Sequence, residues 1–166
     1  MKKSLFLENT KLLNNQFNIV PLMYGSLGLE YITNENLNSD DIDILIPEVF
    51  LKERWNEFKE ILSQHNYHLI DEKEHTFVKD NMYYSYASFE ELSTFIKINL
   101  SDIKVINEFG SSFMVLSLEQ YLLVYSTSIN DGYRINIRKK KDEEKTVCFC
   151  FGSVSRKESI ADIRVF

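Results

Sequence analysis

The pattern that most constrains this chain joins a glycine turn to a pair of aspartates. Tyr24-Gly25-Ser26 is followed, fifteen residues after Ser26, by the run Asp41-Ile42-Asp43-Ile44-Leu45-Ile46. Side chains alternate along a strand, so the two aspartates would project from one face while the isoleucines point to the other. Paired carboxylates repel each other unless a cation or a shared proton lies between them, and a Gly-Ser turn can offer backbone N–H groups to a phosphate. Together the two motifs predict a site for magnesium and a nucleotide.

Composition predicts a folded domain outside the membrane. The chain has 166 residues, of which 44% are hydrophobic, so we expect a single domain over residues 1–166 with a core over about 17–146 and an unassigned tail over 152–166. No apolar run approaches the roughly 20 residues that span a bilayer, and the N-terminus lacks the pattern of a signal peptide. We therefore expect a cytoplasmic protein with no membrane partner.

Charge limits the partners of the chain. A net charge of −6 argues against a protein whose whole surface tracks nucleic acid. A local basic patch that includes Arg138-Lys139-Lys140-Lys141 remains open, with a solvated helix face or turn as the alternative.

Hydrophobic periodicity predicts an α+β (mixed α/β) fold, with a small mixed sheet flanked by helices. We expect helices over 4–17, 27–32 and 48–64, and a further helix opened by a capping box of Ser117 and Gln120. Expected strands cover 19–23, 41–46, 67–70, 75–79, 82–89, 94–100, 103–109 and 112–116, with turns at Asp80-Asn81 and Gly110-Ser111. Residues 134–145 fit helix or strand, and 147–151 fit a short strand.

Gly25-Ser26 and Asp41-Ile42-Asp43 resemble the signature of the DNA polymerase β-like nucleotidyltransferase superfamily. In that signature a Gly-Gly or Gly-Ser turn leads from a strand into a helix, and an Asp-x-Asp or Asp-x-Glu pair lies on the next strand. More loosely, Asp131-Gly132-Tyr133-Arg134 and Lys140-Lys141-Asp142 resemble a basic segment of small bacterial members, which include antitoxin-like proteins and proteins that modify aminoglycosides or lincosamides.

The resemblance implies a role for each motif. Gly25 and Ser26 would bind the triphosphate of a nucleoside triphosphate, and Asp41 and Asp43 would be catalytic ligands of Mg²⁺. Lys141 or Lys145 could meet a phosphate. The reaction would move a nucleoside monophosphate to a hydroxyl acceptor, which could be a small molecule, an RNA or a protein.

The position of a third carboxylate is the open point of this assignment. Superfamily members carry it on a later strand, but the segments 82–89 and 94–100 have no acidic residue inside them. Glu90 is the best remaining candidate for a catalytic third acid, with Glu91 and Asp102 behind it. The alternative is a catalytically inactive, nucleotidyltransferase-like module that binds a nucleotide or a protein partner, in an antitoxin-like or regulatory role.

The aromatic residues of the expected strand 82–89 leave a second alternative open. Tyr83, Tyr84, Tyr86 and Phe89 could fill the core or a cross-strand ladder, or one of them could stack on a base.

Overall fold

The computed structural model describes residues 2–129. Residues up to Leu123 form one compact unit, and the end of the last helix, from Val124, belongs to a second unit and is described by itself. The helices of the described chain are α1 (Lys2–Phe17), α2 (Gly25–Thr33), α3 (Trp55–Gln64), α4 (Phe89–Ile96) and α5 (Leu118–Ile129), with short 3₁₀ helices η1 (Glu48–Phe50) and η2 (Leu100–Asp102). Its strands are β1 (Leu22–Met23), β2 (Ile42–Ile46), β3 (His68–Asp71), β4 (Thr76–Lys79), β5 (Met82–Ser88), β6 (Lys104–Glu108) and β7 (Ser111–Val115).

The strands form one mixed sheet in the order β3-β4-β5-β2-β1-β7-β6. β2 runs parallel to β5 and antiparallel to β1, while β1 runs parallel to β7. Antiparallel pairing joins β3, β4 and β5 at one side, and β6 and β7 at the other. The expected α+β class with a mixed sheet and flanking helices is confirmed.

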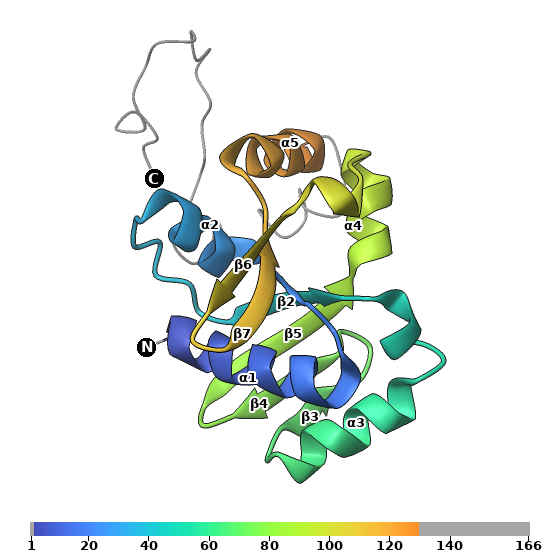
Figure 1. Cartoon of the computed structure of the whole chain (residues 1–166). Coiled ribbons are helices and arrows are strands. Elements are labelled where there is room, and N and C mark those ends of the chain that lie inside the picture. The colour runs from blue at the N-terminus through green and yellow to red at the C-terminus, as the bar shows by residue number, and fades with distance from the viewer. Residues whose placement is uncertain (1, 130–166) are drawn as a thin grey trace, which may run out of the picture. The chain divides into compact units, whose positions relative to one another are not determined.

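The main core lies on the face of the sheet that α1 and α3 cover (Figure 1). Ile42, Ile44 and Ile46 of β2 are fully buried there, as the alternation of the strand predicts. Phe58 of α3 is also fully buried, and its ring meets the ring of Tyr86 edge to face at 5.1 Å. Burial of one such side chain stabilises the fold by about 1.5–3 kcal/mol, so this face supplies much of its stability.

A polar contact inside this core fixes α1 on β5. The buried Asn9 Nδ2 donates a hydrogen bond of 2.7 Å to Tyr86 Oη. Burial raises the pKa of the Tyr86 phenol well above its ordinary value, because the low-dielectric interior disfavours a phenolate. Tyr84, two residues earlier on β5, is buried as well, whereas Tyr83, the residue before it, is 49% exposed on the other face.

Most expected elements are confirmed, and one expected strand is wrong. Residues 94–100 do not form a strand, because the helix α4 occupies Phe89–Ile96. Ser88 Oγ caps this helix by accepting hydrogen bonds from the backbone N–H groups of Glu90 (3.0 Å) and Glu91 (3.2 Å). The expected helix over 48–64 is also divided, into η1 and α3.

The capping box at the start of α5 is present as predicted. Ser117 N donates to Gln120 Oε1 at 2.8 Å, and Gln120 N donates to Ser117 Oγ at 3.2 Å. The interpretations of residues 134–151 lie outside the described residues. Among residues 2–129, no helix combines the length and the apolar character that crossing a membrane requires.

Candidate functional site

The glycine turn connects β1 to α2 and is joined to β2 by a backbone hydrogen bond. Tyr24 N donates a hydrogen bond of 3.1 Å to Asp43 O, which ties the residue before the glycine to the second aspartate. Gly25 has a φ of 61° and is the first residue of α2. The left-handed conformation at this position favours glycine, because other residues would bring Cβ against the backbone.

The carboxylate of Asp43 lies directly against Gly25. A Cβ atom at Gly25 would lie 1.9 Å from Asp43 Oδ2 and 2.9 Å from Asp43 Cγ, so any larger residue would displace this carboxylate. The glycine turn and the aspartate pair are therefore in contact, although 17 residues lie between Gly25 and Asp43 in the chain. The fold brings a carboxylate to the start of a helix.

The other predicted residues of the two motifs lie close by along the chain. Ser26 is the second residue of α2 and is half-buried. Asp41 directly precedes β2 and is also half-buried, two residues before Asp43. The first N–H groups of a helix have no partner within it, so the start of α2 presents donors to an anion.

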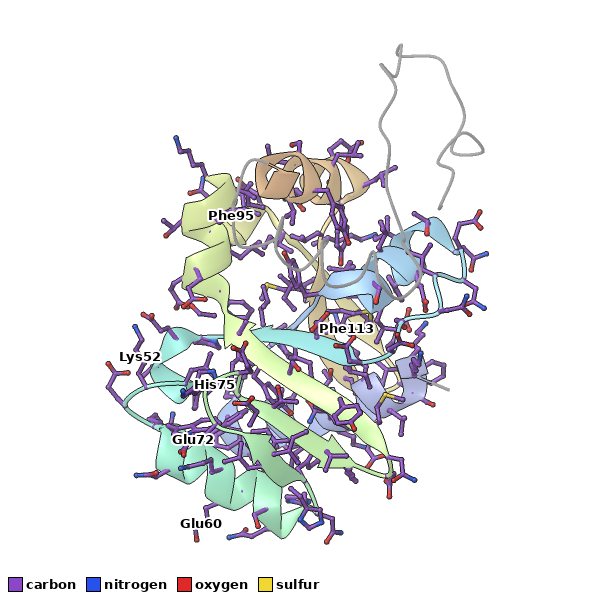
Figure 2. All side chains as sticks on the ribbon, turned by 180° about the vertical axis from the view of Figure 1, so that it is seen from behind. Lys52, Glu60, Glu72, His75, Phe95 and Phe113 are labelled. Atoms are coloured by element: carbon purple, nitrogen blue, oxygen red, sulfur yellow. The ribbon has the colours of Figure 1, made fainter. Side chains whose placement is uncertain are left out.

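Strand β5 contributes hydroxyl groups beside the aspartates. Ser85 is the residue of β5 opposite Asp43, and Thr76 of β4 is opposite Ser85. The hydroxyl oxygens Ser85 Oγ and Thr76 Oγ1 are 3.1 Å apart. Because paired residues of neighbouring strands share a face, Asp43, Ser85 and Thr76 form a polar row on the face of the sheet opposite the buried Tyr84 and Tyr86. Figure 2 shows the molecule from behind, with β4 and β5 in front of α1.

Tyr83 lies two residues before Ser85 and, by alternation, on the same face as the polar row. Of the four aromatic residues whose role was left open, Tyr84, Tyr86 and Phe89 are buried and only Tyr83 is substantially exposed. Ser85 and Thr76 have no signal in the sequence, because only the register of the sheet places them in line with Asp43.

Glu90 lies away from the aspartate pair. Its Oε2 accepts hydrogen bonds of 2.9 Å from Glu48 N and from Ser88 Oγ. Since Ile46 pairs with Ser88 in the β2–β5 register, this contact lies beyond the last residue of β2, whereas Asp41 and Asp43 lie at the beginning of that strand. Glu91 is in the first turn of the same helix, and Asp102 is in η2.

Within residues 2–129, no group of three or more His, Cys, Asp or Glu side chains is arranged to hold a metal ion. Lys141 and Lys145, the predicted phosphate contacts, lie outside the described residues. The arrangement at hand therefore offers two carboxylates, a helix N-terminus and neighbouring hydroxyl groups.

Comparison with known proteins gives one solved structure of similar fold and one sequence relative. A crystal structure from Thermotoga maritima, described as a "putative nucleotidyltransferase", superposes with a TM-score of 0.51 at 16% identity, covering 86% of this chain and 94% of that one. This similarity shows that the chain has a nucleotidyltransferase-like fold. No family model matches the chain.

The sequence relative comes from Bacillus subtilis (strain 168) and carries the name "Uncharacterized protein YnaI". It is 35% identical over 140 residues, which cover 84% of this chain and 90% of the relative. Identity of this extent establishes common descent over most of both proteins. The chain is thus a member of the same protein family as YnaI of Bacillus subtilis, with a nucleotidyltransferase-like fold.

Proposed function

We propose that the chain binds a magnesium–nucleoside triphosphate complex at Gly25, Ser26, Asp41 and Asp43, and transfers the nucleoside monophosphate to a hydroxyl acceptor. The acceptor could be a small molecule, an RNA or a protein. The observation that carries the proposal is the contact between the Asp43 carboxylate and Gly25 at the N-terminus of α2. This contact brings an oxygen ligand for a cation beside N–H donors for a phosphate.

The two aspartates fit Mg²⁺ in a particular way. Mg²⁺ in phosphate-transfer sites binds through one or two carboxylates and completes its ligand set with water and substrate phosphates. Asp41 and Asp43 would supply the carboxylates, so the metal alone should bind weakly and the nucleotide should bring it. When bound, the ion neutralises charge on the triphosphate.

The residues of the chain then orient the substrate. The N–H groups at the start of α2 and the hydroxyl of Ser26 would hold phosphate oxygens, and Lys141 or Lys145 would add positive charge to them. Glu90 takes no part in the proposed reaction. Its hydrogen bonds to Glu48 and Ser88 support a structural role at the junction of β2 and α4.

A second candidate function is nucleotide binding without transfer, in a regulatory or antitoxin-like module. The observation that favours it is Ser85, because a hydroxyl rather than a carboxylate lies opposite Asp43 on β5. Two-metal phosphoryl transfer needs enough anionic ligands to hold both ions, and a hydroxyl is a weaker ligand for Mg²⁺ than a carboxylate. The two candidates share a binding site and differ in chemistry.

Thermal shift measurements test the shared binding site. The melting temperature should rise when Mg²⁺ and one of ATP, GTP, CTP or UTP are added together, and change little with Mg²⁺ alone. Asp43→Asn should abolish the shift. Asp40→Asn is the matched control, since it removes the same charge from an exposed residue next to the site and should retain the shift. No shift with any of the four nucleotides would contradict both candidates.

Transfer is tested with nucleotides labelled at the α-phosphate, incubated with Mg²⁺ and fractions of bacterial small molecules, RNA and protein. A labelled product with release of pyrophosphate supports the enzyme, and Asp43→Asn should remove it. Binding without release supports the module. In that case Ser85→Asp, which restores a carboxylate opposite Asp43, should tighten Mg²⁺-dependent nucleotide binding.

A further inference from the structure

Two hairpins of this chain turn with the same backbone conformation but different residues. Asp80 and Asn81 connect β4 to β5 with φ values of 51° and 60°, and Phe109 and Gly110 connect β6 to β7 with values of 49° and 77°. Positive φ at both positions is the type I′ arrangement, for which Asn, Asp and Gly are preferred. Phe109 is the exception, because a bulky side chain is disfavoured in this conformation.

Nothing in the packing of the described chain explains this phenylalanine. Its side chain is 86% exposed, the largest value among the exposed large hydrophobic residues of the described part. A strained and exposed aromatic residue costs stability without burying surface within residues 2–129. Exposed aromatic residues of this kind often anchor contacts with another protein.

Phe109 directly follows β6, the strand at one edge of the sheet. Within the described residues, β6 pairs with β7 alone, and Val105 of β6 is 51% exposed. In an antiparallel pair, alternate residues direct their backbone groups to the partner, and a two-residue turn closes on a hydrogen-bonded pair. Glu108 pairs with Ser111, so its backbone N–H and C=O groups point toward β7. The backbone N–H and C=O groups of Val105 and Asn107 therefore point away from β7, to the open edge of β6.

We propose that β6 joins two copies of this chain, pairing antiparallel with β6 of the second copy about a two-fold axis at Ile106. Val105 would then pair with Asn107 of the second copy, so the outward backbone groups of both strands would bond to each other. The same register places Lys104 opposite Glu108 of the second copy, twice by symmetry. Phe109 would lie level with Ile103 of the second copy at each end of the pair.

The charges select this register among those that the backbone allows. Pairing Val105 with itself would set Lys104 opposite Ile106, and pairing Asn107 with itself would set Ile106 opposite Glu108. Only the register centred on Ile106 gives each charge an opposite charge across the strands. This self-complementarity favours a second copy over an unrelated strand.

Glu108 can take part in this contact while keeping its present partners. Its Oε1 accepts a hydrogen bond of 2.6 Å from Tyr31 Oη, and its Oε2 lies 2.7 Å from Lys3 Nζ. A carboxylate offers about four acceptor positions, and the Glu108 side chain is 26% exposed, so a lysine of the second copy could join at Oε1 while the buried Oε2 stays with Lys3.

Sedimentation velocity of the full chain over a wide concentration range tests the proposal. The chain should form a dimer as concentration rises, and Phe109→Asn should weaken the dimer at least tenfold. Because Asn suits the turn, Phe109→Asn should leave the melting temperature unchanged or raise it. Asp80→Asn puts the same residue at the equivalent position of the other turn and should leave the dimer intact. A chain that stays monomeric, for example because its own residues cover β6, would overturn the proposal, as would a dimer insensitive to Phe109→Asn.

Charge exchange gives a second test that a general loss of stability cannot imitate. Lys104→Glu and Glu108→Lys should each be monomeric alone, because each places like charges opposite one another. Mixed in equal amounts, the two variants should form a heterodimer, since every pair becomes complementary. A mixture of folded variants, checked by circular dichroism, that does not dimerise would overturn the register.

Discussion

Gly25 and Gly110 both have a left-handed backbone conformation, but for different reasons. Gly25 has a φ of 61° and Gly110 a φ of 77°. The space where a Cβ would stand is filled by the Asp43 carboxylate at Gly25, whereas at Gly110 no atom beyond the adjacent residues lies within 4 Å of that position. Gly110 is required only by the backbone of its turn, whereas Gly25 also leaves space for the Asp43 carboxylate. A positive φ alone therefore does not identify a site; the neighbouring atoms do.

The largest expected effect comes from Gly25→Ala. The added Cβ would collide with Asp43 and adopt a disfavoured φ, so we expect a loss of about 3 kcal/mol or more in the free energy of unfolding. Nucleotide binding should be lost as well, because the carboxylate must move. Urea denaturation measures the first effect and thermal shift with Mg²⁺ and nucleotide measures the second.

A double-mutant cycle assigns this loss to Asp43. In an Asp43→Ala background most of the collision is removed, so Gly25→Ala should cost about 1–3 kcal/mol less than in the parent chain. Additive losses would mean that the contact between Gly25 and Asp43 is not the cause.

Gly28→Ala should have an intermediate effect. Gly28 lies in α2 with ordinary helical φ, but a Cβ there would lie 2.0 Å from Tyr121 Oη and 2.6 Å from Met23 O. The hydroxyl can move and the backbone carbonyl cannot, so we expect a loss of about 2 kcal/mol, measured by thermal unfolding. If Tyr121→Phe rescued it completely, the carbonyl would not be the obstacle.

Gly110→Ala should cost only about 1 kcal/mol, the price of a left-handed alanine with open space around it. Thermal unfolding at the same pH measures the difference from Gly25→Ala. Equal losses in the two variants would show that backbone conformation, and not the Asp43 contact, governs both positions.

The smallest expected effect concerns the hydrogen bond between Tyr31 and Glu108, the residue before the Phe109-Gly110 turn. Hydrogen bonds from Lys3 and Tyr31 lower the pKa of Glu108 below its ordinary 4.5, so this carboxylate contributes stability above pH 4.5 that is lost as the pH falls through its folded pKa. Burial, with the Glu108 contact, raises the pKa of Tyr31 from 10.0 to about 12, so the phenol contributes stability below pH 10 that is lost as the pH rises toward 12.

Tyr31→Phe removes the titrating phenol and one of the two contacts of Glu108, while the contact with Lys3 remains. We expect a loss of at most about 1 kcal/mol at neutral pH and a flatter dependence of unfolding free energy on pH above 10. Urea denaturation across the pH range checks both, and Tyr83→Phe, which alters an exposed phenol elsewhere, provides the control. A variant with the slope of the parent chain above pH 10 would contradict the assignment to Tyr31.

Some features that depend on residues close together in the chain were predicted correctly. The Ser117–Gln120 box, the Asp80-Asn81 turn and the buried isoleucines of β2 follow from neighbouring residues, and the structure has all three. The prediction of a strand over 94–100 was wrong. It rested on the alternation of Ile96, Ile98 and Leu100, but Phe89, Leu92 and Ile96 have the spacing of a helix. The start signal Ser88-x-x-Glu91 favoured the helix and could have decided the case.

The candidate site was predictable only in part, because its residues come together through the pairing of strands. Gly25 and Asp43 carry a recognisable spacing, but their contact depends on the pairing of β1 with β2. Ser85 has no local signal at all, since its position beside Asp43 follows from the register of two strands that lie some 40 residues apart in the chain.

The brevity of β1 has a consequence for the order of folding. Its two residues connect a four-strand segment, built mostly from the run 42–88, to a hairpin formed by 104–115. Both of those pieces can assemble from nearby residues, whereas pairing Leu22 with Met114 closes a loop of 92 positions. We therefore expect β1 to pair with β7 late in folding. The rate of folding should be limited by this pairing rather than by formation of the four-strand segment or of the hairpin.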